Sequence, residues 1–341
     1  MALFSGPLPL VPPAARRSGD AQPGAPRVVA LGGGHGLSAS LSALRLLTQE
    51  LTAVVTVADD GGSSGRLREE LSVLPPGDLR MALAALCDDT DWGRTWRDVM
   101  QHRFASKEGV GGSLDGHAMG NLLIVTLWEL LGDPVAGLQW AGALLGARGR
   151  VLPMASVPLT IEGDVLSEVD GSLRSTTVTG QAQLAEAAEK GNVSHVRLLP
   201  PDAAACQDAL EAIELADWVI LGPGSWYTSV LPHLLLPELR ETLCRTSARR
   251  CLTMNLSNET TETQGMTAVD HLRVITRYAP DFTVDVVLAD PTVVRDRTEF
   301  ERVVEEMGGR AVFGTVGAST GKPVHDPLRL ATSYNDMFGE I

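Results

Sequence analysis

The stretch VVALGGGHGLSASLSALRLL, residues 28–47, places a short apolar strand directly before a glycine-rich loop and a helix opened by Ser38. TAVVTVADD, residues 52–60, follows as a second apolar strand and ends on Asp59 and Asp60. Two strands joined by a helix in this way run parallel in one sheet. The pattern therefore predicts an α/β fold with a mainly parallel sheet.

The loop between this first strand and its helix carries four glycines in five positions. Glycine lets backbone N–H groups approach an anion closely, and the N-terminus of the next helix adds partial positive charge. The loop therefore predicts phosphate binding by Gly32, Gly33, Gly34, His35, Gly36, Leu37 and Ser38. It is not the dinucleotide fingerprint G-x-G-x-x-G, because Leu37 stands where the third glycine belongs. A tight structural turn is the alternative.

Two carboxylates end the second strand, where a doubly wound sheet places groups that reach a ribose or a metal. These are Asp59 and Asp60, and we also expect one of them to cap the next helix. The residues that follow supply hydrogen-bond donors suited to phosphate: Ser63, Ser64 and Arg66.

Two shorter motifs add candidates. In PPGDLR, residues 75–80, Asp78 and Arg80 are either ligand contacts or, for Asp78, the N-cap of a helix. In GHAMGN, residues 116–121, glycines flank a histidine, which favours a ligand contact by His117 and Asn121. No second His or Cys stands at ligand spacing, so we expect no metal site of that kind.

A second strand-loop-helix pattern occurs at LGPGSWYTSVLP, residues 221–232. It predicts a second cradle, built from Gly222, Pro223, Gly224, Ser225, Tyr227 and Thr228. Asn255 follows a later strand, and Glu262 and Thr263 stand in the polar loop after it. Two cradles in one chain are harder to explain as turns than one.

Composition narrows the class of protein. A formal net charge of −14 repels a nucleic-acid backbone, so we expect no nucleic-acid partner. The four cysteines form no C-x-x-C pair, which fits a cytoplasmic protein without a disulfide framework. No apolar run reaches the roughly 18 residues of a membrane span.

Patterning along the chain divides it into five parts. Residues 1–26, rich in Pro, Ala, Gly and Arg, predict a disordered N-terminal tail. Residues 27–156 form the nucleotide-binding α/β part. Short alternating runs predict a β-rich insertion at residues 157–200. Residues 201–330 complete the sheet, and residues 331–341 are expected to form a tail.

In their order along the chain, these motifs resemble the YvcK-type gluconeogenesis factors, relatives of 2-phospho-L-lactate transferase in the CofD-like superfamily. The resemblance rests on GGGHGLS, VADDGGSSGRLR, PPGDLR, GHAMGN, LGPGSWYTSVLP and N-L-(x)5-ET-(x)6-DHL, and runs from Val28 to about Gly317. It implies a Rossmann-like three-layer α/β/α fold that binds UDP-sugars, notably UDP-N-acetylglucosamine. It also implies a role in directing carbon into cell-wall precursors and in cell shape, together with a partner enzyme of cell-wall precursor or sugar metabolism.

This sequence departs from the family pattern at two places. The family loop often reads N-x-x-T-Q-P-G-E-T, whereas here the Pro-Gly turn is lost and Glu259 adds a negative charge. Members often carry a tyrosine at the position of Met266, which the resemblance links to sugar-nucleotide binding. A methionine cannot form the hydrogen bonds of a phenol, so this change bears on affinity and ligand identity.

Three functions therefore compete. The sequences of the motifs favour a regulator that binds a UDP-sugar, needs no cofactor and catalyses no reaction. The first alternative is a Mg²⁺-dependent transferase in which Asp59 and Asp60 hold the metal. The second is a protein that binds a dinucleotide such as NAD, with Asp59 on a ribose. The sequence leaves open a homo-oligomer and does not name the partner enzyme.

Overall fold

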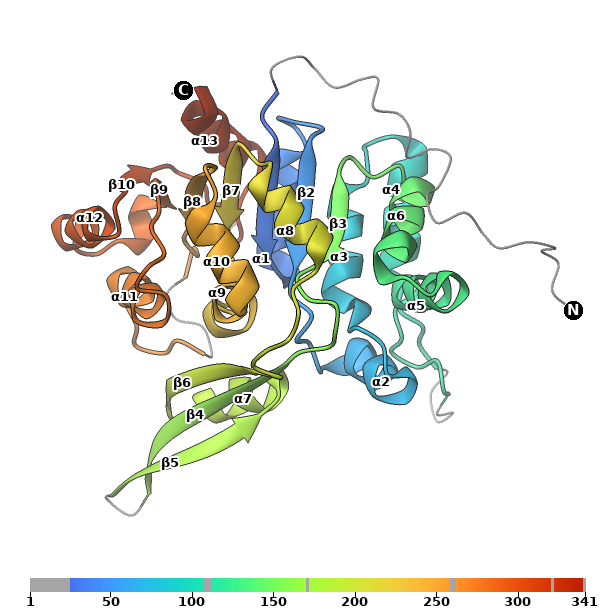
Figure 1. Ribbon diagram of the computed structural model, residues 1–341, viewed down its shortest axis with the longest axis horizontal. Helices are drawn as coiled ribbons and strands as arrows, with labels where there is room; N and C mark the ends of the chain where they lie inside the picture. Colours follow the sequence, from blue (N-terminus) through green and yellow to red (C-terminus); the bar gives the residue numbers. More distant parts are fainter. Residues whose placement is uncertain (1–24, 107–111, 170–171, 258–261, 320–321, 340–341) are drawn as a thin grey trace, which may run out of the picture.

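A computed structural model describes residues 25–106, 112–169, 172–257, 262–319 and 322–339. Seven of its strands form one sheet, in the order β10-β9-β8-β7-β1-β2-β3 (Figure 1). Every neighbouring pair is parallel. The strands are β1 (Val28–Gly32), β2 (Leu51–Val55), β3 (Arg150–Pro153), β7 (Trp218–Leu221), β8 (Arg249–Thr253), β9 (Val286–Ala289) and β10 (Arg310–Phe313).

Helices cover both faces of this sheet (Figure 1). On one face α1 (Gly34–Leu44) packs between α3 (Pro76–Leu86) and α13 (Pro327–Gly339). On the other lie α8 (Gln207–Glu214), α9 (Pro232–Leu235) and α10 (Pro237–Arg245). The remaining helices of the main body are α2 (Gly62–Leu71), α4 (Asp91–Gln101), α5 (Met119–Leu131), α6 (Pro134–Leu145), α11 (Ala268–Tyr278) and α12 (Arg297–Glu306). The Rossmann-like three-layer fold is therefore confirmed.

The central strands are apolar because neither of their faces meets water. Every residue of β1, β7 and β9 is buried, as expected for parallel strands covered by helices on both sides. Within the described residues, no helix combines the length and the apolar character that crossing a membrane requires.

A small antiparallel sheet lies between β3 and α8 in the chain. Its order is β5-β4-β6, and the strands are β4 (Thr160–Val169), β5 (Ser172–Thr179) and β6 (Asn192–Leu199). Helix α7 (Gln181–Ala188) packs against β4 and β5. Figure 1 shows this unit projecting from the lower edge of the molecule. It is the β-rich insertion that the alternating pattern predicts.

The two ends of the chain differ from each other. Residues 1–24 of the expected N-terminal tail lie outside the described residues. At the other end, the expected tail is wrong for residues 331–339, which belong to α13. Leu330, Ala331, Tyr334 and Met337 are buried at helical spacing. This apolar stripe packs α13 beside α1.

Two helix starts also differ from expectation. Helix α1 begins at Gly34 and not at Ser38, with Gly34 at a φ of 55° that favours glycine. Helix α3 begins at Pro76, because proline suits the first helical position. Asp78 therefore lies inside the first turn of α3 and is not its N-cap.

The strand order reverses beside β1. The chain moves outward from β1 to β2 and β3, and later returns to build β7, β8, β9 and β10 on the other side. The loops after β1 and β7 therefore leave the sheet toward opposite helical layers. Ligands of doubly wound sheets bind in the crevice that opens at such a reversal.

Candidate functional site

The two glycine loops meet at this reversal. A side-chain carbon built on Gly36 would lie 2.2 Å from the carbonyl oxygen of Pro223 and 2.6 Å from the Cα of Gly224. A carbon on Gly33 would lie 2.5 Å from both a carboxylate oxygen of Asp78 and the methyl carbon of Thr56. Glycine at position 36 is thus required for the two loops to touch, and glycine at position 33 is required for the first loop to approach Asp78 and Thr56.

The second loop is held in shape by an asparagine from the next strand. Asn255, just after β8, accepts a hydrogen bond from Gly224 N at 2.9 Å and donates one to Gly224 O at 2.8 Å. Gly222 has a φ of 77°, a conformation that glycine adopts readily. The amide side chain therefore fixes the turn by bonding both polar groups of one peptide residue.

A buried network of hydroxyl groups also holds this second loop in place. Ser40 Oγ of α1 donates to Gly222 O at 3.0 Å and lies 3.0 Å from the hydroxyl of Tyr334. Tyr334 also contacts Thr253 Oγ1 at 2.9 Å and is fully buried. Sequence reasoning missed Tyr334, although its place on the apolar stripe of α13 was a usable signal.

The residues after the second loop are tied to the Glu262 carboxylate. Ser225 Oγ donates to one of its oxygens, and Thr228 Oγ1 donates to the other at 2.9 Å. Thr228 lies in a π-helical turn, η2 (Trp226–Val230), which continues into α9. Burial raises the pKa of Glu262 above its usual value. The predicted candidates Ser225, Thr228 and Glu262 therefore form one hydrogen-bonded unit.

A cavity of about 300 Å³ opens beside this unit, between the insertion and α11. Its lining includes Tyr227, Glu262, Thr263, Met266, Asn192 of β6 and Arg277 of α11. Met266 Sδ lies 4.0 Å from the Tyr227 hydroxyl, whose pKa burial raises to about 12. Glu259 and the lost Pro-Gly turn lie outside the described residues.

Two carboxylates stand beside the first loop. Asp78 accepts a hydrogen bond from the backbone N–H of Gly34, at the N-terminus of α1. Burial, together with the negative charge of Asp59, raises the pKa of Asp78 to about 7. Burial also raises the pKa of Asp59, which accepts from Gly61 N at 2.9 Å. The two carboxylates that stand together beside the first loop are therefore Asp59 and Asp78, and not Asp59 and Asp60.

Asp60 has a different role from its neighbour. Its Oδ1 accepts from Ala182 N at 3.1 Å, in the first turn of α7 in the insertion. The N-cap of α2 is Gly61, without a side-chain hydrogen bond, so the expectation that Asp59 or Asp60 caps that helix is wrong. Asp60 caps a distant helix because the insertion folds back onto the loop after β2.

A second polar cluster lies on the other side of these carboxylates, where α2, α3 and α5 begin. Ser63 Oγ accepts from Asn121 Nδ2 at 3.0 Å and from Ala118 N at 3.3 Å, and it lies 3.1 Å from His117 Nδ1. Asn121 Oδ1 in turn accepts from Arg80 Nε at 2.9 Å. Burial lowers the pKa of Arg80 to about 10, and burial and Arg66 lower that of His117.

Two further arginines contact the backbone just before α5. Arg66 Nη2 donates to Asp115 O at 2.7 Å, and Arg103 Nη1 donates to Gly116 O at 3.0 Å. Arg103 was not among the candidates, because no motif surrounds it. An isolated antiparallel β-bridge between Arg103 and Ala118 brings Arg103 to this loop, and that bridge exists only in the folded chain.

The structure thus divides the predicted residues into two sets with Asp59 and Asp78 between them. The glycine half consists of Gly32, Gly33, Gly34, His35, Gly36, Ser38, Gly222, Pro223, Gly224, Ser225, Tyr227, Thr228, Asn255, Glu262, Thr263 and Met266. The arginine half consists of Ser63, Arg66, Arg80, His117 and Asn121, joined by Arg103. Ser64 instead accepts a hydrogen bond from Gly77 N at 3.0 Å and bonds Asp59. Leu37 belongs to the apolar core, and Asp60 faces the insertion.

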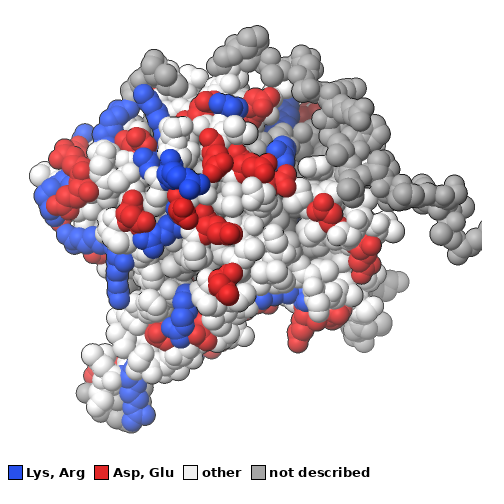
Figure 2. Space-filling view, in the orientation of Figure 1, with Lys and Arg blue, Asp and Glu red and all other residues white. Residues whose placement is uncertain are grey.

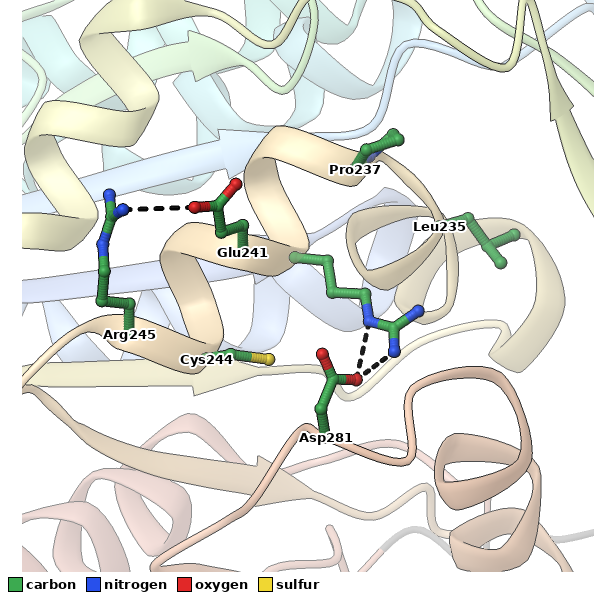
Figure 3. A pocket seen from close by; sticks show the side chains of 7 residues that line it. Leu235, Pro237, Glu241, Cys244, Arg245 and Asp281 are labelled. Atoms are coloured by element: carbon green, nitrogen blue, oxygen red, sulfur yellow. Dashed lines mark hydrogen bonds and ion pairs between the residues drawn. The ribbon is translucent and has the colours of Figure 1, made fainter.

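The part of the chain that is described contains no group of three or more His, Cys, Asp or Glu side chains arranged to hold a metal ion. A further groove of about 480 Å³ lies on α10, where Arg240 Nε donates to Asp281 at 2.9 Å (Figure 3). None of the predicted candidates lines that groove.

Comparison with known proteins decides the family. A family model described as 2-phospho-L-lactate transferase CofD matches residues 28–308. The chain belongs to the CofD family. Among CofD-family relatives, a putative gluconeogenesis factor of Mycobacterium tuberculosis is 51% identical over 307 residues, 89% of this chain and 88% of that protein.

A gluconeogenesis factor of Bacillus subtilis is 34% identical over 287 residues, 84% of this chain and 85% of that protein. A crystal structure of a UPF0052 family member from Bacillus halodurans matches with a TM-score of 0.77 and 34% identity. It covers 90% of this chain and 97% of the other. The resemblance to gluconeogenesis factors of the CofD type is therefore confirmed.

Proposed function

We propose that this protein binds a nucleotide-sugar of the UDP-N-acetylglucosamine type at the carboxyl edge of the sheet and acts as a regulator without turnover. Its role would be to link carbon metabolism to the supply of cell-wall precursors, and through it to cell shape. The partner would be an enzyme of cell-wall precursor or sugar metabolism in the cytoplasm.

The contact between the two glycine loops is the observation that carries this proposal. Gly36 and Gly224 bring the N-terminus of α1 against a turn whose backbone Asn255 fixes. Helix N-termini and exposed backbone N–H groups are suited to a diphosphate. The cavity lined by Tyr227 and Met266 adjoins this turn and is of the size of small-molecule sites.

A regulator also needs a connection between its ligand and its outer surface. Asp59 faces the loops, while the adjacent Asp60 caps α7 of the insertion. Arg68 Nη2 donates to Thr160 Oγ1 at the start of β4, which ties α2 to the same unit. A ligand that moves Asp59 would therefore act directly on the position of the insertion.

The Asp59–Asp78 pair favours the second candidate, a Mg²⁺-dependent transferase acting on a nucleotide-diphosphate donor. Carboxylate oxygens suit Mg²⁺, and two half-buried carboxylates with raised pKa values gain from a cation between them. Asp59 and Asp78 would hold the ion, and Asp60 would not, since α7 engages it. Bound Mg²⁺ would neutralise charge on the diphosphate.

The third candidate, an NAD-binding protein, has less support. Leu37 replaces the third glycine of the dinucleotide fingerprint and is buried in the core. We therefore expect UDP-sugars to raise the Tm more than NAD does. At 100 times its Kd, a specific ligand adds about 2.7 kcal/mol to the free energy of unfolding.

Calorimetric titration of Asp59→Asn with UDP-N-acetylglucosamine, in Mg²⁺ and in EDTA, separates the regulator from the transferase. If Asp59 bonds ligand hydroxyls directly, the substitution weakens binding about tenfold to hundredfold in both conditions. Asp98→Asn, which removes an exposed carboxylate from α4, is the matched control and should bind normally.

A loss confined to the Mg²⁺ titration would favour the transferase. Product formed from a nucleotide-diphosphate donor would establish it. Strong stabilisation by NAD, with none by uridine nucleotides, would contradict the proposal that the ligand is a UDP-sugar.

A further inference from the structure

Arg80 is a buried cation without a carboxylate partner. Its side chain is 4% exposed, and its Nε donates to Asn121 Oδ1. Among the described residues, no carboxylate pairs with Arg80, and its Nη atoms are not among the fully buried atoms that lack a hydrogen bond, so they are open to solvent. Burying a charge is costly unless an opposite charge or a full set of hydrogen bonds compensates it. The guanidinium therefore has capacity for an anion.

Arg66 and Arg103 add positive charge at the same place. Each donates to a backbone carbonyl, of Asp115 and Gly116 respectively, and neither pairs with a carboxylate in the described structure. The positive charge of Arg103 contributes to lowering the pKa of the Arg80 guanidinium. The acidic groups nearby are Asp59 and Asp78, whose charges act on Arg80, Glu70, whose charge acts on His117, and Asp115, on which the charge of Arg66 acts.

These three arginines lie together in a chain whose net charge is −14. Elsewhere on the face seen in Figure 2, blue basic side chains lie next to red acidic ones. Ion pairs elsewhere in the described structure include Arg240 with Asp281 and Arg197 with Asp164. Three arginines around one loop without such partners indicate a site for an external anion.

The hydrogen-bond network also fixes the proton on His117. Arg80 can only donate, so Asn121 presents its oxygen to Arg80 and its Nδ2 to Ser63. Ser63 Oγ thus accepts from Asn121 Nδ2 and Ala118 N, and its own proton goes to His117 Nδ1. The neutral imidazole then carries its hydrogen on Nε2, which is a further donor.

We propose that Arg66, Arg80, Arg103 and His117 form a second anion site, which binds the phosphate group of a small molecule other than the nucleotide-sugar. Guanidinium groups match phosphate oxygens with paired N–H donors, and all four side chains present donors. The site lies on α2, α3 and the segments that lead into α5, whereas the proposed nucleotide site lies on the loops after β1, β7 and β8 and reaches Asp59, which follows β2. That this anion site is separate from a nucleotide-sugar site rests on the proposed function.

Titration with inorganic phosphate, in a buffer without other oxyanions, tests this site by calorimetry and by ³¹P line broadening. We expect saturable binding to the full chain. Arg103→Gln and Arg80→Gln should each weaken it at least tenfold, since each removes hydrogen bonds to a charged group. Arg103 is exposed, so its substitution is compatible with folding even if that of Arg80 is not.

Arg174→Gln is the matched control, because it removes an exposed arginine from β5 of the insertion. Its phosphate affinity should equal that of the wild type. Absence of phosphate binding to the wild type, or binding that Arg103→Gln leaves unchanged, would overturn the proposal.

A second titration is made on protein saturated with UDP-N-acetylglucosamine. Phosphate affinity unchanged within about twofold supports two separate sites. Loss of phosphate binding under saturation would mean that the arginines belong to the nucleotide site, and would overturn the proposal. If the nucleotide-sugar does not bind at all, the proposed function fails while the first titration still decides whether the arginines hold phosphate.

Discussion

The glycine half and the arginine half of the cleft are built on different principles. In the glycine half, backbone atoms form the surface, and internal bonds such as those from Asn255 to Gly224 fix their shape. In the arginine half, side chains form the surface, and the positive charge of Arg80 has no carboxylate partner among the described residues. The first half is therefore sensitive to added volume, and the second to lost or altered charge.

The largest effect is expected where the two loops touch. In Gly36→Ala the new methyl group would lie 2.2 Å from Pro223 O and 2.6 Å from Gly224 Cα, and both are backbone atoms that cannot turn aside. We expect a loss of about 3 kcal/mol or more in the free energy of unfolding, together with loss of nucleotide binding. Chemical denaturation measures the first and calorimetry the second.

Gly62→Ala is the control for this substitution. Gly62 lies in the first turn of α2, as Gly36 lies in the first turn of α1; its φ is 51°, but nothing lies within 4 Å of its added carbon. Its cost should be limited to the backbone strain of about 1 kcal/mol. Equal costs at positions 36 and 62 would show that the loops do not press against each other.

A smaller effect is expected between the halves, at Asp78. Its pKa is about 7 in the folded protein and close to 3.9 in the unfolded chain, so the folded state holds the proton more tightly. The charged form therefore destabilises the fold increasingly as pH rises from about 4 through 7. Asp78→Asn removes this charge and should raise the Tm by a few degrees at pH 8, with the gain shrinking toward pH 5.

Thermal unfolding at pH 5, 6.5 and 8 measures this difference, with Asp98→Asn as the exposed control. A Tm gain of Asp78→Asn that is larger at pH 5 than at pH 8 would contradict the assignment. Such a result would indicate that Asp78 is stabilised as an anion, for example by Arg80.

The contrast between the halves also explains what sequence could reveal. Glycines after apolar strands are a local pattern, and the prediction of a parallel sheet with loops at strand ends is confirmed. Asp60 and Arg103 act through contacts 122 and 15 residues away, with Ala182 and Ala118. No local pattern encodes such partners. The missed helix α13 is different, because Leu330, Tyr334 and Met337 showed its apolar stripe in the sequence itself.

The smallest expected effect lies at Met266, where this chain departs from the tyrosine of the family pattern. Met266 lines the 300 Å³ cavity beside Tyr227, and its side chain is half-buried there. Met266→Tyr would bring a phenol hydroxyl to this wall. One new hydrogen bond contributes about 0.5–1.5 kcal/mol, so we expect UDP-N-acetylglucosamine to bind roughly two- to tenfold more tightly.

Met266→Phe is the matched variant, since it adds the same ring without the hydroxyl. Calorimetry on both variants separates the hydrogen bond from the added apolar contact, which phenylalanine also supplies. If phenylalanine gives the same gain as tyrosine, the ligand offers no polar group at this wall. If neither variant changes affinity, the cavity is not in contact with the nucleotide-sugar, and the ligand lies wholly on the glycine loops and Asp59.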